Sequence, residues 1–467
     1  MTHFQDSESD FEDSEDDYDI ITSKYQNFVI RLKTIRRVKN ITEAAIRVLE
    51  RNTGLTIRNL RQYNPREDFG LTIAGVLISN TTLTTLNLEK NNLGESFGLA
   101  IAGVLRSNTT LMTLKLNENN LRDVGVSAVA EALEKNTTLT TLEIGCNYFR
   151  EVGISAVVKS LEENTTLTEL NLECNQFIGE YGVAVARVLE RNTTLVCLNL
   201  NWIQFGEVRG EAIMRALETN NTLMEINLGR NSLGEDFGMA IAGLLERNTT
   251  LTTLDLSSNH FEEESGIAIA CALEKNTTLT TVKLGDNQLE EDFGVAVAGL
   301  LERNTTLTTL DLQYNWVGEV GGVAVARALE RNTTLKTLVL FQNSLGEGVG
   351  VAFARVLKMN TTLTELNLGI NYLGQPGCES VINALVSNTT LTSLNLAQNE
   401  FGQDGMIDVK CLLDSNTTIT SLSLWNNGFT KSFLRKLEKV LSKREAVIPQ
   451  ALPDVKPVVA CQYRTDI

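Results

Sequence analysis

The chain has 467 residues and a formal net charge of −17 at neutral pH, and nine of its carboxylates lie between Asp6 and Asp19. A chain this acidic disfavours direct binding to nucleic acid, because it would repel the phosphate backbone. No run reaches the roughly 18 apolar residues that a bilayer span requires, and the acidic N-terminus lacks the basic and apolar parts of a secretory signal. We therefore expect a protein of the cytoplasm, with the nucleus as the alternative, and no contact with a membrane.

The chain begins with two segments of opposite charge. Residues 1–23 hold many acids and few apolar groups, which predicts a disordered acidic tail. Residues 24–51 are basic at first, and their last part resembles the second half of the repeats that follow, so we expect an N-terminal cap. The simplest interpretation of the charges is that the tail and the basic segment attract each other.

A motif close to Asn-Thr-Thr then returns with a constant 28-residue period from Asn80 to Asn416, without insertion or deletion, and a weaker copy starts at Asn52. A fixed period of this length indicates an array of stacked repeats. We place the array at residues 52–443, with a polar-faced helix closing it. Residues 444–467 are expected to form a C-terminal tail.

The repeat that starts at Asn80 shows how each one is built. Leu86 and Leu88 alternate with polar residues, which predicts a short strand with one buried face. Phe97 and Leu105 follow at helical spacing, so each repeat is a strand, a loop and a helix. The columns that repeat Leu105 and Ala100 are predicted to face a shared core, with the small alanines letting neighbouring helices lie close together.

The Asn-Thr-Thr motif matches the acceptor pattern for N-glycosylation, but a protein that is not exported would not meet the glycosylating enzymes. Its recurrence therefore needs a structural cause. We predict that the asparagine ends each helix in a left-handed backbone conformation, which asparagine tolerates better than other residues with a side chain. The β-branched threonines then suit the start of a strand.

The residues Leu83, Leu86, Leu88, Asn91 and Leu93 spell LxxLxLxxNxL. With a 28-residue period and a helix in each repeat, the chain resembles the ribonuclease-inhibitor type of leucine-rich repeat, and is similar to the repeats of NOD-like receptors and of the Ran GTPase-activating protein. The resemblance implies an α/β fold: a right-handed leucine-rich-repeat solenoid (horseshoe) with a parallel β-sheet on the concave face and α-helices on the convex face. It also implies that the asparagine column hydrogen-bonds to backbone groups of the loops. Ile203 interrupts that column, and we expect a local loosening or bend there.

Candidates for catalysis are scarce. Only two histidines occur, His3 in the acidic tail and His260 in a turn, and no phosphate-binding loop, catalytic triad or metal-ligand spacing can be assembled. We expect no catalysis, no cofactor and no small-molecule substrate. Cys146 and Cys174 occupy the same slot in neighbouring repeats, where a disulfide is geometrically conceivable, but in a reducing compartment we expect none.

Binding of another protein is the better supported prediction, because outward-facing residues of the strands and turns contribute nothing to the core. In most repeats these positions are polar, but three adjacent repeats and one earlier repeat hold large apolar residues there: Tyr314, Trp316, Val339, Phe341, Ile370, Tyr372 and Trp202. Exposed aromatic groups are typical of interface hot spots. The alternative interpretation is that these rings pack on one another.

We therefore expect an interaction scaffold that binds a partner protein through its concave face and the edge of its turns. The alternative is a GTPase activator resembling the Ran regulator, in which loops at the repeat edge would orient the nucleotide of a bound GTPase. A third interpretation, an inhibitor of a basic secreted-type enzyme, has little support in the sequence.

Overall fold

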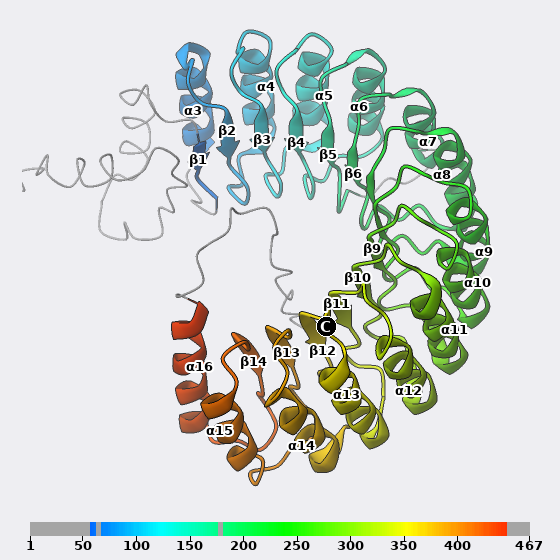
Figure 1. Ribbon diagram of the computed structural model, residues 1–467. Coiled ribbons are helices and arrows are strands. Elements are labelled where there is room, and N and C mark those ends of the chain that lie inside the picture. Colours follow the sequence, from blue (N-terminus) through cyan, green and yellow to red (C-terminus); the bar gives the residue numbers. More distant parts are fainter. Residues whose placement is uncertain (1–56, 62–66, 176–180, 446–467) are drawn as a thin grey trace, which may run out of the picture. The chain divides into compact units, whose positions relative to one another are not determined.

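The computed structural model describes residues 57–61, 67–175 and 181–445, and it confirms that each repeat is a strand, a turn and a helix (Figure 1). The predicted acidic tail and N-terminal cap, and nearly all of the predicted C-terminal tail, lie outside the described residues. The chain divides into two compact bodies: the N-terminal body (residues 1–181 and 192–195) and the C-terminal body (residues 182–191 and 196–467). Among the described helices, none is both long and apolar enough to cross a bilayer.

The described part of the N-terminal body alternates five strands with helices. In chain order they are β1 (Ile57–Asn59), α3 (Glu67–Ser79), β2 (Thr85–Asn87), α4 (Gly94–Leu105), β3 (Thr113–Lys115), α5 (Arg122–Leu133), β4 (Thr141–Glu143), α6 (Glu151–Glu163) and β5 (Glu169–Asn171). Each strand pairs in parallel with the next, and the paired residues occupy the same position in consecutive repeats, as Leu86 with Leu114. The 28-residue period of the sequence therefore sets which residues pair between neighbouring strands.

The C-terminal body has the same alternation of strand and helix over more repeats. Its elements are α7 (Tyr181–Arg191), β6 (Cys197–Asn199), α8 (Glu207–Thr219), β7 (Glu225–Asn227), α9 (Gly234–Leu245), β8 (Thr253–Asp255), α10 (Glu263–Leu273), β9 (Thr281–Lys283), α11 (Glu290–Arg303), β10 (Thr309–Asp311), α12 (Gly318–Leu329), β11 (Thr337–Val339), α13 (Glu347–Met359), β12 (Glu365–Asn367), α14 (Gly374–Leu385), β13 (Ser393–Asn395), α15 (Met406–Ser415), β14 (Ser421–Ser423) and α16 (Lys431–Glu445). Its strands are again parallel and in 28-residue register. Within each body the strands form one layer and the helices the other, which confirms the expected α/β solenoid.

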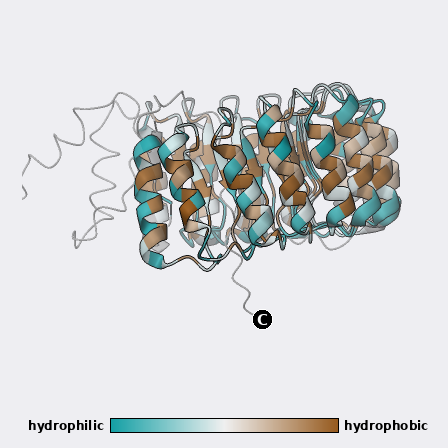
Figure 2. Cartoon of the chain, turned by 60° about the horizontal axis from the view of Figure 1, so that its bottom comes forward, coloured by the Kyte–Doolittle hydropathy of each residue, from teal (hydrophilic) through white to brown (hydrophobic). Residues whose placement is uncertain are grey.

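The core lies between the two layers and is built from the predicted leucine columns. Leu86 and Leu88 have no exposed surface, and Leu105 and Phe97 on the helix are equally buried. Polar and apolar residues alternate along individual helices, as in amphipathic helices with one side on a core (Figure 2). The leucine columns therefore face inward along the described array.

The prediction for the alanine column is wrong in its detail. Ala100 and most of its counterparts are only half-buried, and Ala240 is exposed. The closest helix approaches occur at glycines instead: a Cβ added to Gly98 in α4 would lie 2.4 Å from the Cα of Gly125 in α5. The same contact recurs between α11 and α12 and between α13 and α14. Helices of neighbouring repeats therefore touch backbone to backbone, which no side chain would permit.

The prediction of a left-handed asparagine at the helix end is also wrong. Asn304 follows α11 with φ −72° and ψ 133°, which is extended backbone, and four further helix-terminal asparagines agree. Its Oδ1 accepts hydrogen bonds from the backbone N–H of Thr306 (2.9 Å) and Leu307 (2.8 Å), while its Nδ2 donates to the carbonyl oxygen of Leu273 (2.8 Å) at the end of the preceding helix. This turn requires an extended residue, and one side chain thereby serves both the next strand and the previous repeat.

Arg444 closes this column of asparagines. It stands one repeat after Asn416, and its guanidinium donates to the carbonyl oxygens of Leu413 (2.6 Å) and Ile419 (3.1 Å). An asparagine in this position would reach the same helix-terminal carbonyl. The 28-residue register therefore extends through α16.

A second column of asparagines is completely buried in the turns, as the resemblance implies. Asn287 donates from Nδ2 to the carbonyl oxygens of Leu256 (3.1 Å) and Leu284 (3.0 Å), and its Oδ1 accepts from the N–H of Asn259 (2.8 Å). The column consists of Asn91, Asn119, Asn147, Asn175, Asn231, Asn259, Asn287, Asn315, Asn343, Asn371, Asn399 and Asn427. Ile203 is buried in the gap, where its N–H donates to Oδ1 of Asn231 (2.9 Å). Loosening around Ile203 stays a prediction.

We predict that Asn287→Ala lowers the free energy of unfolding by about 3 kcal/mol or more, because it leaves several buried carbonyl and amide groups without their partner. Urea denaturation followed by circular dichroism measures the change. Lys336→Ala, which shortens an exposed side chain beside β11, is the matched control and should change stability by less than about 0.5 kcal/mol. A loss below about 1 kcal/mol for Asn287→Ala would contradict the role given to the column.

Candidate protein-binding surface

The turn after each strand fixes where the candidate binding residues point. In nearly every repeat, the residues immediately before and after the buried asparagine have left-handed backbone conformations. Tyr314 and Trp316 (φ 57° and 55°) flank Asn315, and Ile370 and Tyr372 (both φ 55°) flank Asn371. These four candidate residues therefore lie in the turns and not in the strands.

Hydrogen bonds to the next repeat hold this turn in place. Oδ1 of Asn343 accepts from the N–H of Asn315 (3.1 Å) and of Val317 (3.2 Å), the two residues beside Trp316. The N–H of Tyr314 donates to the carbonyl oxygen of Phe341 (2.9 Å). With the backbone fixed on both sides, the Trp316 side chain is directed away from the core and is 57% exposed.

The structure brings six of the seven candidates together on neighbouring repeats of the C-terminal body. The rings of Tyr314 and Phe341 meet edge to face at 5.5 Å between centroids, and Phe341 covers Gly369, where an added Cβ would lie 2.8 Å from the ring. Val339 is half-buried in β11. We call these six residues the apolar patch: Tyr314, Trp316, Val339, Phe341, Ile370 and Tyr372.

The patch combines packed and free groups. Tyr314, Val339, Phe341 and Ile370 are half-buried, so the alternative of mutual packing describes part of the patch. Trp316 and Tyr372, in contrast, are 57% and 62% exposed. They occupy the same turn position two repeats apart, roughly 10 Å at the spacing of parallel strands.

Trp202 is not part of this cluster. It lies four repeats before Tyr314, roughly 19 Å away at the spacing of the strands, and the guanidinium carbon of Arg230 lies 5.9 Å from its ring centroid. Among the described turns, Tyr148 in the N-terminal body and Trp425 beside β14 are also exposed aromatic residues. Trp202 therefore forms a separate, smaller feature.

An acidic group lies beside the patch in the sheet. Asp311 of β10 pairs in register with Val339 of β11 and is 8% exposed. Burial raises the pKa of Asp311 to about 6, although the N–H of Gln313 donates to its Oδ1 (3.1 Å) and the nearby Lys283 opposes the shift. Lys283 itself is 3.2 Å from the Asp255 carboxylate. The patch thus borders a buried carboxylate whose negative charge is only partly balanced by a nearby positive charge.

The histidine and the two cysteines considered in the sequence lie in turns of the described repeats. His260 is exposed in a left-handed turn, and no group of three or more His, Cys, Asp or Glu side chains in the described residues could hold a metal ion. Cys146 and Cys174 are free thiols in adjacent turns. The hydrogen bond from Cys146 to the Cys174 sulfur raises the pKa of Cys146 and lowers the pKa of Cys174.

A column of acids that the sequence analysis did not use shapes the edge of the turns. The Glu235 carboxylate accepts hydrogen bonds from the N–H of Glu262 and of Ser265 (both 2.8 Å), so it caps the helix of the following repeat. Four others make such bonds: Asp123, Glu263, Glu291 and Glu319. The sequence could have predicted these capping acids, because an acid recurs at this position of the repeat through much of the array.

We predict that Asp311→Asn stabilises the protein at pH 7. The folded-state pKa of about 6 exceeds the ordinary value of 3.8, so the folded state binds the proton more tightly and the wild type loses stability as pH rises from about 4 to 6. The variant removes this cost and should gain roughly 3 kcal/mol at pH 7 and less than about 1 kcal/mol at pH 4. Asparagine already makes the equivalent turn hydrogen bond in other repeats, as at Asn367.

Urea denaturation of both proteins at pH 4 and pH 7 checks this. A variant less stable than the wild type at pH 7, or a gain that does not change with pH, would contradict the assignment to Asp311.

Comparisons with known proteins agree with this architecture. The model of the TMOD/LMOD leucine-rich domain matches residues 181–319, and a leucine-rich repeat model matches residues 79–96, 107–130, 135–158, 163–184 and 387–409. No curated protein matches the sequence. Neither model specifies the ribonuclease-inhibitor type, so that subtype stays a prediction.

Solved structures are similar at low sequence identity. A chain in the complex of Rad7 and Elc1 from yeast is 16% identical, with a TM-score of 0.51 over 78% of this chain and 90% of that one. An internalin from Listeria monocytogenes is 21% identical (TM-score 0.44; 86% of this chain and 93% of that one), and leiomodin-1 actin-binding site 2 is 23% identical (TM-score 0.30; 33% and 90%). Together with the observed strand, turn and helix of every repeat, the family models identify the repeats of this chain as leucine-rich repeats.

Proposed function

We propose that this chain is a non-catalytic interaction scaffold that binds a partner protein through the apolar patch of the C-terminal body. The observation that supports this most directly is the exposure of Trp316 and Tyr372 at left-handed turn positions, where smaller residues would suffice for the fold. Large exposed aromatic side chains that lie on one surface are the groups that dominate binding energy at protein interfaces.

The backbone cost of the patch supports the same proposal. Ile370 is β-branched and has φ 55°, a conformation that disfavours such a residue by roughly 1–3 kcal/mol. The other site, directly after the buried asparagine, holds Trp316 and Tyr372 in the patch but Asn92 and Asn120 in other repeats, and asparagine tolerates this conformation. Bulky residues at these sites weaken the fold slightly, which is understandable if they serve binding.

The charge beside the patch indicates the chemistry of the partner. Asp311 is buried without full compensation, and Glu365 of β12 is exposed close to the patch. A partner that places an apolar or aromatic group against Trp316 and Tyr372, and a lysine or arginine over the sheet, would cover the apolar surface and also neutralise the acids. We therefore expect a partner with mixed apolar and basic character.

We predict that the double variant Trp316→Asn/Tyr372→Asn folds normally and loses partner binding. Each ring should contribute roughly 2 kcal/mol, about a 30-fold change in Kd. Affinity capture with mass spectrometry identifies the partner, and calorimetry with the purified partner then measures the Kd. The melting temperature should not fall, because asparagine suits the left-handed turn.

Ser344→Asn is the matched control, because Ser344 occupies the same turn position between the two aromatic residues and has φ 54°. It should leave binding unchanged. If the double variant binds the purified partner as tightly as the wild type does, the patch is not the binding surface; if it unfolds, the rings serve the fold instead.

The GTPase-activator alternative stays a prediction and has its own measurement. Adding the protein to Ran loaded with GTP should accelerate phosphate release if the chain acts as an activator, and leave the rate unchanged if it acts only as a scaffold. Residence in the cytoplasm likewise stays a prediction.

A further inference from the structure

Two adjacent repeats of the N-terminal body replace a glycine by arginine at the start of the helix. Seven other repeats have glycine there with a left-handed backbone: Gly94, Gly206, Gly234, Gly318, Gly346, Gly374 and Gly402. Arg122 keeps the left-handed conformation (φ 51°), which an arginine adopts only at a cost, and Arg150 holds the same position in the next repeat. Glutamate stands at this position in two other repeats, Glu262 and Glu290, and a further arginine, Arg66, stands there two repeats before Arg122. Arg122 and Arg150 are the pair of basic residues that occupy this position in adjacent repeats.

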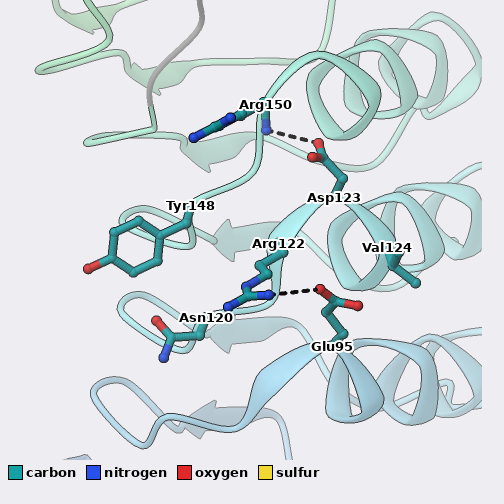
Figure 3. Close-up of a pocket in the computed structure, with 7 residues that line it drawn as sticks. All are labelled: Glu95, Asn120, Arg122, Asp123, Val124, Tyr148 and Arg150. Atoms are coloured by element: carbon teal, nitrogen blue, oxygen red, sulfur yellow. Dashed lines mark hydrogen bonds and ion pairs between the residues drawn. The ribbon is translucent and has the colours of Figure 1, made fainter.

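The two arginines line a pocket of about 760 Å³ at the edge of the turns. Its lining consists of Glu95, Asn120, Arg122, Asp123, Val124, Tyr148 and Arg150. Figure 3 shows Tyr148 between the two arginines, with its ring directed away from the helices. Tyr148 is 67% exposed and also has a left-handed backbone (φ 57°). The pocket therefore combines two guanidinium groups with one exposed aromatic face.

The two acids of the pocket form few ion pairs with these guanidinium groups. Oδ1 of Asp123 accepts hydrogen bonds from the backbone N–H of Arg150 and of Gly153 (both 2.8 Å), so its charge caps helix α6. Glu95 lies 3.8 Å from Nη1 of Arg122, a long contact between exposed groups. Within the part of the chain that the structure describes, the Arg150 guanidinium has no carboxylate at ion-pairing distance.

We propose that this pocket binds an acidic peptide, with a carboxylate or phosphate group held by Arg150 and Arg122 and the peptide chain packed on Tyr148. A guanidinium group matches both oxyanions with two parallel hydrogen bonds, and an aromatic ring supplies contact area at low entropic cost. The site is separate from the apolar patch and differs from it in chemistry. Nucleic acid is the weaker choice of anion, since the chain's net charge of −17 opposes a long phosphate backbone.

The occupant that the charge and length of the chain favour is its own residues 6–19, which contain nine carboxylates and three serines. An acidic peptide of another protein is the alternative outcome of the experiment. Residues 20–56 separate that segment from β1, and a chain of that length is long enough to reach β4, which lies only roughly 14 Å from β1 at the spacing of parallel strands. The experiment distinguishes the two.

Fluorescence polarisation of a fluorescein-labelled hexaglutamate peptide, and of a phosphoserine-containing counterpart, measures binding to the full chain. We expect Arg122→Gly/Arg150→Gln to weaken binding of at least one acidic peptide tenfold or more, and added salt to weaken it in the wild type. A hexaglutamine peptide should not bind. The melting temperature of Arg122→Gly should not fall, because glycine is the residue of seven other repeats at this position.

Arg106→Gln is the control for charge, since Arg106 follows the opposite end of helix α4 and lies 3.8 Å from Glu131. It should bind as the wild type does. Equal binding by the wild type and the double variant, no binding of either acidic peptide by any full-length form, or a stronger effect of the double variant on a single-stranded RNA than on the peptides would overturn the proposal.

A full-length variant with the nine acids of residues 6–19 changed to asparagine or glutamine identifies the source. If the chain's own segment occupies the pocket, this variant should bind the acidic probe at least tenfold more tightly than the wild type. If the pocket serves another protein, the two should bind the probe equally.

Discussion

The buried asparagine of each turn is the constraint on which the rest of the array depends. Its amide group satisfies carbonyl oxygens of its own repeat and of the preceding one, and its carbonyl oxygen accepts amides from the preceding repeat. A buried polar network is stable only when every member is bonded, so one side chain fixes both the shape of a turn and its distance from its neighbour. A second asparagine, at the start of each repeat, does the same at the other end of the helix.

This hydrogen bonding also lets the exposed side chains of the turns vary without changing the backbone of the turn. Because the backbone on both sides of Trp316, and at Asn147 beside Tyr148, is held by hydrogen bonds to a neighbouring repeat, the identity of the exposed side chain has little effect on the turn. The conformation is left-handed at these positions whether the residue is Asn92, Tyr148 or Trp316. Differences between repeats therefore accumulate where they alter recognition and cost at most the strain of one residue.

The sequence was sufficient for the features that arise from burial within one repeat. The period, the strand, the helix and the Leu86 and Leu88 columns follow from alternation and helical spacing, which local residues determine. The conformation at Asn304 and the close approach of Gly98 to Gly125 were missed because they depend on contacts between repeats. The raised pKa of Asp311 has the same origin, since it needs the neighbouring strands. Six of the candidate residues lie together, as their adjacent repeats implied, but the sequence could not distinguish the packed Phe341 from the free Trp316.

Comparing equivalent positions across repeats distinguishes residues that every repeat needs for folding from residues that serve a local role. In a solenoid with constant period, residues one period apart lie beside each other, so a column in the sequence is a row on the surface. An unbroken column, such as the buried asparagines or the helix-capping acids, marks a structural task that every repeat shares. A departure confined to adjacent repeats does not help the array as a whole, because the other repeats fold without it. Arg122 with Arg150 is a departure of this kind, and Trp316 with Tyr372, two repeats apart, is a similar one. Arg122, Trp316 and Tyr372 also have a left-handed backbone that disfavours such residues, and this is why binding explains them better than folding does.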